Sequence, residues 1–132
     1  MRDDIREARW LYLMNHFRCA YCEVVPEYEY PHCKLGDNLE LEHVWQRMGK
    51  KIDDIQNYVP ACRTSHHWKH LNTQAGRIAA IYWKWKNGEF DRYRLRELID
   101  KDPIGWMSTL AEKPDQLPAW AIDCVHTMLE CF

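Results

Sequence analysis

The hydrophobic pattern of this chain changes its period along the sequence, and this change limits the folds that it can adopt. Apolar and polar residues alternate over 39–44, which predicts a half-buried strand. Tyr58 and Val59 predict a second short strand that ends at Pro60. From Thr64 onward the spacing becomes helical, with Thr64 or Ser65 as the N-cap. The apolar positions of that helix are Ala75, Ile78, Ala79, Tyr82 and Trp83.

Further helices are expected on both sides of the two strands. Asp3 or Asp4 is expected to cap a first helix that ends near residue 17 and has an apolar face of Ile5, Ala8, Leu11 and Tyr12. Asn87-Gly88 is expected to end the central helix, and residues 91–101 and 118–131 fit two more. The polar stretch 46–56 is expected to be a loop. These elements predict an α+β fold, mostly helical, around one short hairpin.

The length and composition place the chain among globular proteins. Its 132 residues predict a single domain over 1–132, and no apolar run reaches the roughly 18 residues that span a bilayer. No secretory signal is visible at the start, so we expect no membrane association and a cytoplasmic location. In that reducing compartment the pair Cys19 and Cys22 favours a metal knuckle or a redox pair over a disulfide.

Basic residues are concentrated in the middle of the chain. Residues 43–101 hold 12 Lys and Arg against 6 Asp and Glu, whereas residues 1–42 and 102–132 are both net acidic. A basic segment is typical of nucleic-acid binding, but it equally fits a solvated helical surface. The side chains expected to contact phosphate are Arg47, Lys50, Lys51 and Lys69, and those that extend this surface are Arg77, Lys84, Lys86, Arg92, Arg94 and Arg96. Five tryptophans are expected to be core residues, with base stacking as the alternative: Trp68, Trp83, Trp85, Trp106 and Trp120.

The residues that carry chemistry follow one another in a fixed order. His66 and His70 are one helical turn apart, so both can bind one cation. Glu42 and His43 are adjacent on a strand, so their side chains point to opposite faces unless the backbone kinks. A carboxylate with two imidazoles suits Zn, Mn, Ni or Mg, and His43 then remains available as a general base.

Three segments of the sequence, 39–44, 57–62 and 66–69, together resemble the HNH or ββα-metal nuclease family. The resemblance covers about residues 17–75, which would form the HNH core, and leaves 76–132 as a C-terminal helical extension. It implies that Glu42 and His66 bind the metal, that His43 activates water and that Asn57 braces the loop between the strands. His70 is similar to the second helical ligand of colicin-type DNases. A metal-dependent endonuclease is therefore expected. DNA is its expected substrate, and RNA is the alternative.

The family commonly adds a structural zinc held by two Cys-x-x-Cys pairs. Here Cys19, Cys22 and Cys62 match that pattern, but Ser65 stands where the fourth cysteine would be. A structural zinc wants four ligands, so the fourth would come from Cys33, His32 or His67. Without zinc, the three cysteines would simply pack in the core.

Two other functions remain open from the sequence. A zinc-knuckle module would bind nucleic acid or protein without cutting, and an inactive nuclease fold would act as a partner protein. The C-terminal helices are expected to supply target contacts, a partner surface or a homodimer interface. The Glu42-His43 pair and the two helical histidines favour the enzyme, because a purely structural knuckle needs no general base.

Overall fold

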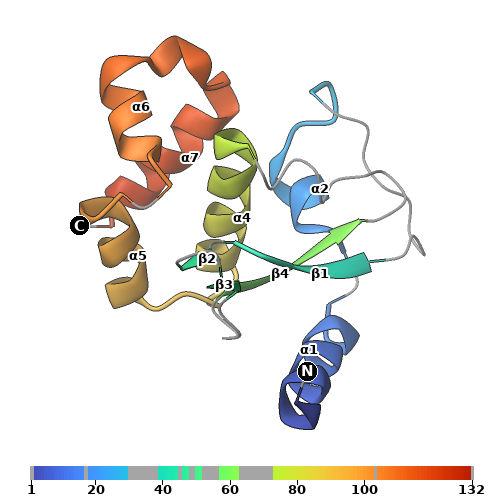
Figure 1. Cartoon of the computed structure of the whole chain (residues 1–132). Helices are drawn as coiled ribbons and strands as arrows, with labels where there is room; N and C mark the ends of the chain where they lie inside the picture. The colour runs from blue at the N-terminus through green and yellow to red at the C-terminus, as the bar shows by residue number, and fades with distance from the viewer. Residues whose placement is uncertain are drawn as a thin grey trace.

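A computed structural model gives the fold of the chain. It describes residues 2–16, 18–29, 39–44, 46–47, 50–51, 57–62, 73–102 and 104–131, with the backbone alone at 46–47 and 50–51. The fold is mixed α+β and mostly helical, as the sequence predicts (Figure 1). Within the described residues, no helix is long and apolar enough to cross a membrane.

The strands form two small antiparallel pairs. β1 (Leu39–His43) pairs with β4 (Tyr58–Cys62), so that His43 lies opposite Tyr58 and Leu39 opposite Cys62. β2 (Gln46–Arg47) pairs with β3 (Lys50–Lys51) in the connection between them. The prediction of a loop over 46–56 was therefore wrong for these four residues.

Pro60 lies inside β4 and does not end it, contrary to the prediction. The backbone N–H of Val44 donates to the carbonyl of Asn57 at 3.0 Å, and ladder pairs alternate between bonded and non-bonded. Counting along the register, Pro60 and its partner Leu41 form a non-bonded pair. The missing N–H of Pro60 would point away from β1, so no hydrogen bond between β1 and β4 is lost. The strand therefore continues to Cys62.

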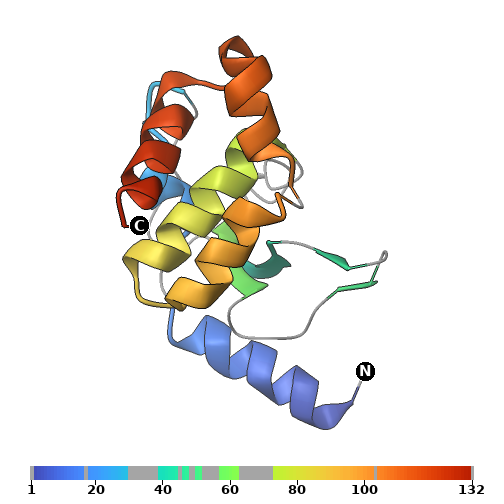
Figure 2. The ribbon, with the colours of Figure 1, turned by 90° about the vertical axis from the view of Figure 1, so that its left-hand side faces the viewer.

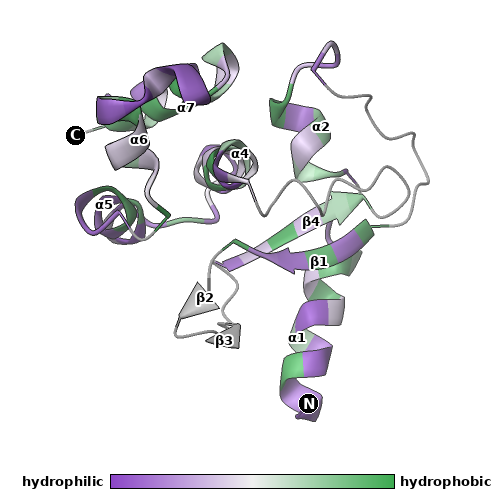
Figure 3. Ribbon diagram, turned by 45° about the horizontal axis from the view of Figure 1, so that its top comes forward, coloured by the Kyte–Doolittle hydropathy of each residue, from purple (hydrophilic) through white to green (hydrophobic). Residues whose placement is uncertain are grey.

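Helices cover the β1–β4 hairpin on both sides. In Figure 3, α2 (Ala20–Val24) and α4 (Gln74–Lys86) lie on one side and α1 (Asp3–Met14) on the other. The N-cap of α1 is Arg2, so the predicted caps Asp3 and Asp4 lie in the first turn instead, where carboxylates are favourable. Its predicted apolar face is only partly correct, because Tyr12 is buried but Leu11 is 46% exposed.

The C-terminal helices pack on α4. Thr73 caps α4 by accepting the Gly76 N–H at 3.0 Å, and Asn87 with Gly88 ends it as predicted. α5 (Arg92–Asp100) and α7 (Ala119–Leu129) match the two predicted segments, and α5 runs beside α4 in Figure 2. Between them lie two unpredicted elements, α6 (Trp106–Glu112) and the 3-10 helix η2 (Pro114–Gln116).

The core lies between α4, the hairpin and the last helices. Trp106, Ile78, Ile81, Val59 and Val125 are all completely buried. Of the tryptophans predicted as core, Trp83 and Trp106 are buried and Trp85 and Trp120 pack against the cluster. Trp68 lies outside the described residues. α2 contacts both α4 and β4, so it links the hairpin to the helices.

Candidate active site

Glu42 and His43 are the last two residues of β1, and both are half-buried. Their partners on β4 are Val59 and Tyr58. Successive side chains of a strand point to opposite faces, so the carboxylate and the imidazole leave the strand in opposite directions. The contacts of the two side chains, described next, agree with this separation.

The imidazole of His43 contacts the ring of Tyr58. Their ring centroids lie 5.5 Å apart and the rings are nearly perpendicular, at 86°. His43 and Tyr58 form a non-bonded ladder pair, in which facing side chains approach most closely. Tyr58 also meets the ring of Tyr12 from α1, at 5.5 Å. The His43 ring therefore lies on the face of the hairpin that carries these two tyrosines.

The Glu42 side chain is near the buried hydroxyl of Tyr21 on α2. Burial raises the pKa of Tyr21 well above its ordinary value, and the charges of Cys19 and Glu42 raise it further. Arg77, in the first turn of α4, acts in the opposite direction. The charges of Glu42 on β1 and Arg77 on α4 thus both act on the phenol of Tyr21 on α2. Of these residues, the sequence singled out Glu42 as a ligand and Arg77 only as part of a basic surface.

Asn57 lies directly beyond the His43–Tyr58 pair. It is completely buried, and its backbone carbonyl accepts the N–H of Val44 at 3.0 Å. This hydrogen bond closes the end of the β1–β4 ladder next to Glu42 and His43. The structure therefore brings three of the predicted site residues, Glu42, His43 and Asn57, to one end of the hairpin.

Two of the three cysteines of the predicted knuckle, Cys19 and Cys62, are in contact. Cys19 is the N-cap of α2, and its Sγ accepts the backbone N–H of Cys62 at 3.2 Å. Both are completely buried, and Cys22 donates its N–H to the Cys19 carbonyl at 3.1 Å. The bond between the Cys62 N–H and Cys19 Sγ places two of the three predicted zinc ligands next to each other.

A metal site is not complete in the part of the chain that the structure describes. No group of three or more His, Cys, Asp or Glu side chains there is placed to hold a metal ion. The predicted ligands His66 and His70 lie outside the described residues, as do Lys69 and the three candidates for a fourth zinc ligand, His32, Cys33 and His67. The side chains of Arg47, Lys50 and Lys51 also lie outside, although β2 and β3 carry their backbones.

A buried polar cluster at the outer edge of β4 was not predicted from the sequence. The Lys84 ammonium donates to Glu89 Oε1 at 2.9 Å and to the Tyr58 carbonyl. The single proton of the Tyr12 hydroxyl is shared between the same carbonyl, at 2.8 Å, and Glu89 Oε1, at 2.7 Å. His16 Nε2 pairs with Glu89 Oε2 at 2.7 Å. Lys84 was expected on a phosphate-binding surface, but its side chain is 0% exposed, so that prediction was wrong.

The acid–base properties of the cluster follow from these contacts. Burial alone would raise the pKa of Glu89. The hydrogen bonds from Tyr12, Lys84 and His16 and the charge of Lys84 outweigh it, so the pKa of Glu89 lies below its ordinary value. Burial also raises the pKa of Tyr12, helped by Glu89. The cluster therefore holds an ionised carboxylate, and the Tyr12 hydroxyl keeps its proton to donate.

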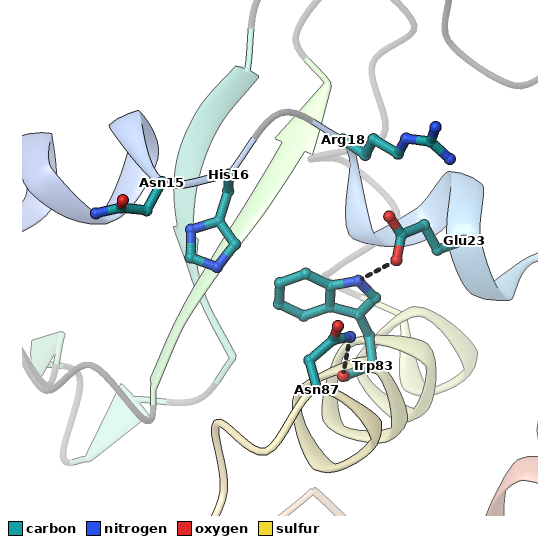
Figure 4. A pocket seen from close by; sticks show the side chains of 6 residues that line it. All are labelled: Asn15, His16, Arg18, Glu23, Trp83 and Asn87. Carbon is teal, nitrogen blue, oxygen red and sulfur yellow. Dashed lines mark hydrogen bonds between the residues drawn. The ribbon is translucent and has the colours of Figure 1, made fainter.

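A pocket of about 240 Å³ borders this cluster at His16 (Figure 4). Asn15 and His16 reach it from the end of α1, Arg18 and Glu23 from the α2 region, and Trp83 and Asn87 from the end of α4. Several of its polar atoms already have partners. The Trp83 indole donates to Glu23 at 2.9 Å, and the Asn87 amide donates to the Trp83 carbonyl at 2.7 Å.

Comparison with known proteins does not assign the chain to a family. No protein-family model matches the chain, and no match is found among curated proteins or among solved structures. The resemblance to HNH nucleases accordingly rests on the residues of the sequence.

Proposed function

We propose that the protein is a metal-dependent endonuclease of the HNH type that hydrolyses phosphodiester bonds, with DNA as its substrate. The observation that supports it most is the meeting of Glu42, His43 and Asn57 at one end of an antiparallel hairpin. A nuclease of this type needs a carboxylate for the cation and a separate imidazole for water. Glu42 and His43 supply these two groups from adjacent positions at the end of β1.

In this mechanism His43 removes the proton from a water molecule that attacks phosphorus in line with the departing 3′ oxygen. Glu42, His66 and His70 would hold one divalent cation (Mg, Mn, Ni or Zn), a donor set that suits such metals. When bound, the cation supplies Lewis acidity at the scissile phosphate. Asn57 closes the ladder beside His43, and Arg47, Lys50, Lys51 and Lys69 are the proposed phosphate contacts.

DNA is proposed over RNA on the family resemblance alone. The C-terminal extension, residues 76–132, is proposed to supply target contacts or an interface with a partner or a second copy. The cytoplasm stays the proposed compartment on the argument from the sequence.

A zinc-knuckle binding module is the second candidate. It is favoured by the hydrogen bond from the Cys62 N–H to Cys19 Sγ, which brings two of the three knuckle cysteines together. In that reading Cys19, Cys22 and Cys62 would bind a structural zinc and the protein would dock on nucleic acid without cutting it. The half-buried His43 has no role in that function, which is why the enzyme is preferred.

The test is a plasmid cleavage assay with Mg, Mn, Ni or Zn that compares the wild type with His43→Ala. We expect the variant to lose about 10²–10⁴ in rate, because a general base contributes that much. The matched control is His126→Ala, which removes an exposed histidine from α7. Wild-type binding to DNA without cleavage under any of the four metals would favour the binding module. Cleavage by His43→Ala within about twofold of the wild type would refute the assigned base.

A further inference from the structure

We propose that Tyr12, Lys84 and Glu89 form a clamp that positions His43 through the Tyr58 carbonyl, an inference that rests on the proposed role of His43 as general base. These are positioning residues that act on His43 through Tyr58. They bond to the Tyr58 carbonyl and to one another, and Glu89 also pairs with His16.

The Tyr58 carbonyl points away from β1. Val44 and Asn57 form a bonded pair, so the next pair, His43 and Tyr58, is non-bonded, and its backbone groups face outward. β1 therefore cannot satisfy this carbonyl. Two side chains do so instead, the Tyr12 hydroxyl from α1 at 2.8 Å and the Lys84 ammonium from α4.

Glu89 fixes both donors. Its Oε1 lies 2.7 Å from the Tyr12 oxygen, whose one proton it shares with the Tyr58 carbonyl, and it accepts from Lys84 at 2.9 Å. Its Oε2 pairs with His16 at 2.7 Å. Tyr12 and His16 also stack, with ring centroids 4.0 Å apart. The clamp thus joins α1 and α4 at a single backbone oxygen of β4, and its donors are held in place by a carboxylate.

Tyr58 is also the residue that meets the His43 ring, so a shift of its backbone is passed on to the imidazole. An isolated two-stranded hairpin is marginally stable and gives little rigidity of its own. Rigid placement matters to a general base, because misplacement by about 1 Å costs about 10²-fold in rate. The clamp supplies that rigidity from the helices at the residue opposite His43.

The test uses Tyr12→Phe, which removes one oxygen and keeps the ring. The matched control is Thr109→Val, which removes a comparable hydrogen bond, from the Thr109 hydroxyl to the Gly105 carbonyl at 3.0 Å, in α6. Plasmid cleavage with Mn²⁺ gives kcat and KM for each variant. Histidine side-chain NMR of the full chain, with His43 assigned from the spectrum of His43→Ala, reports the ring position without any need for activity.

We expect Tyr12→Phe to lower kcat about 3–10-fold, which is less than the loss for a full 1 Å displacement, with KM unchanged. It should also move the His43 ring signals, whereas Thr109→Val should do neither. Unmoved His43 signals, or a fall in kcat no larger than that of Thr109→Val, would overturn the clamp. Absence of cleavage by the wild type would refute the nuclease instead, and the NMR comparison would still decide whether the clamp positions His43.

Discussion

Replacing Lys84 with methionine should destabilise the protein much more than the loss of an ordinary ion pair. The Lys84 side chain is completely buried and Glu89 is 18% exposed, with the charged atoms 2.9 Å apart. Removing one partner of a buried pair leaves the other charge uncompensated, which typically costs about 3–5 kcal/mol. Glu89 keeps contacts with Tyr12 and His16, so we expect the lower end, about 3 kcal/mol. For a domain of this size that lowers Tm by about 12 °C.

The control for this experiment is Lys101→Met. Lys101 pairs with Glu97 at 3.4 Å, but the two side chains are 73% and 49% exposed. Such a surface pair contributes at most about 0.5 kcal/mol. Urea and thermal unfolding followed by circular dichroism would measure both variants. A free energy of unfolding for Lys84→Met within about 1 kcal/mol of that for Lys101→Met would refute the assigned energetics of the cluster.

Four further predictions follow from other parts of the molecule. Because the pKa of Glu89 is lowered, the stability that it contributes is present above its ordinary pKa of 4.5 and is lost as the pH falls through the folded value. Glu89→Gln should therefore show a smaller loss of stability on acidification than the wild type, measured by urea unfolding between pH 5 and pH 3; parallel losses would contradict this. Asp102→Ala should cost about 0.5–2 kcal/mol, since its carboxylate accepts the N–H groups of Met107 and Ser108 at 2.9 and 3.0 Å, and an unchanged Tm would disprove the cap. Cys22→Ser should release zinc in elemental analysis and lower Tm in thermal unfolding. Cys124→Ser should not release zinc, because burial raises the pKa of Cys124 to about 11 and keeps its thiol protonated. A zinc-free wild type would show that the cysteines only pack in the core. Charge reversal of Lys50 and Lys51 together should reduce the salt dependence of DNA binding by up to about two counterions, and an unchanged slope would place the DNA on another surface.

Local patterns in the sequence were enough to predict most of the helices and the pairing strands. Asn87 and Gly88 end α4 where expected, because a helix C-terminus depends on the residues next to it. α6 was missed for the opposite reason. Its first N–H groups are capped by Asp102, four residues before Trp106, and Asp102 adopts a positive φ of 46°. The sequence at Asp102 indicates only an interruption between two helices.

The candidate site was predictable only where its residues are neighbours along the chain. Glu42 and His43 are adjacent, and alternation along a strand is enough to separate their side chains. The cluster around Glu89 was not predictable, because its partner Tyr12 lies 77 positions away and meets it only after α1 packs on the hairpin. Lys84 lies outside the predicted apolar face of its helix and was therefore expected to be a surface charge, and only the tertiary fold shows that it is buried. The ligand roles of His66 and His70 stay predictions.

The outer edge of β4 has a consequence for how this protein behaves at high concentration. An exposed strand edge can template another strand and so start aggregation. Along β4, the Tyr58 carbonyl accepts hydrogen bonds from Tyr12 and Lys84, Pro60 has no N–H, and the Cys62 N–H donates to Cys19 Sγ. These alternate positions are the ones that a neighbouring chain would need. β4 is thus protected against edge-to-edge strand addition by side chains from three other segments, the ends of α1 and α4 and the N-cap of α2.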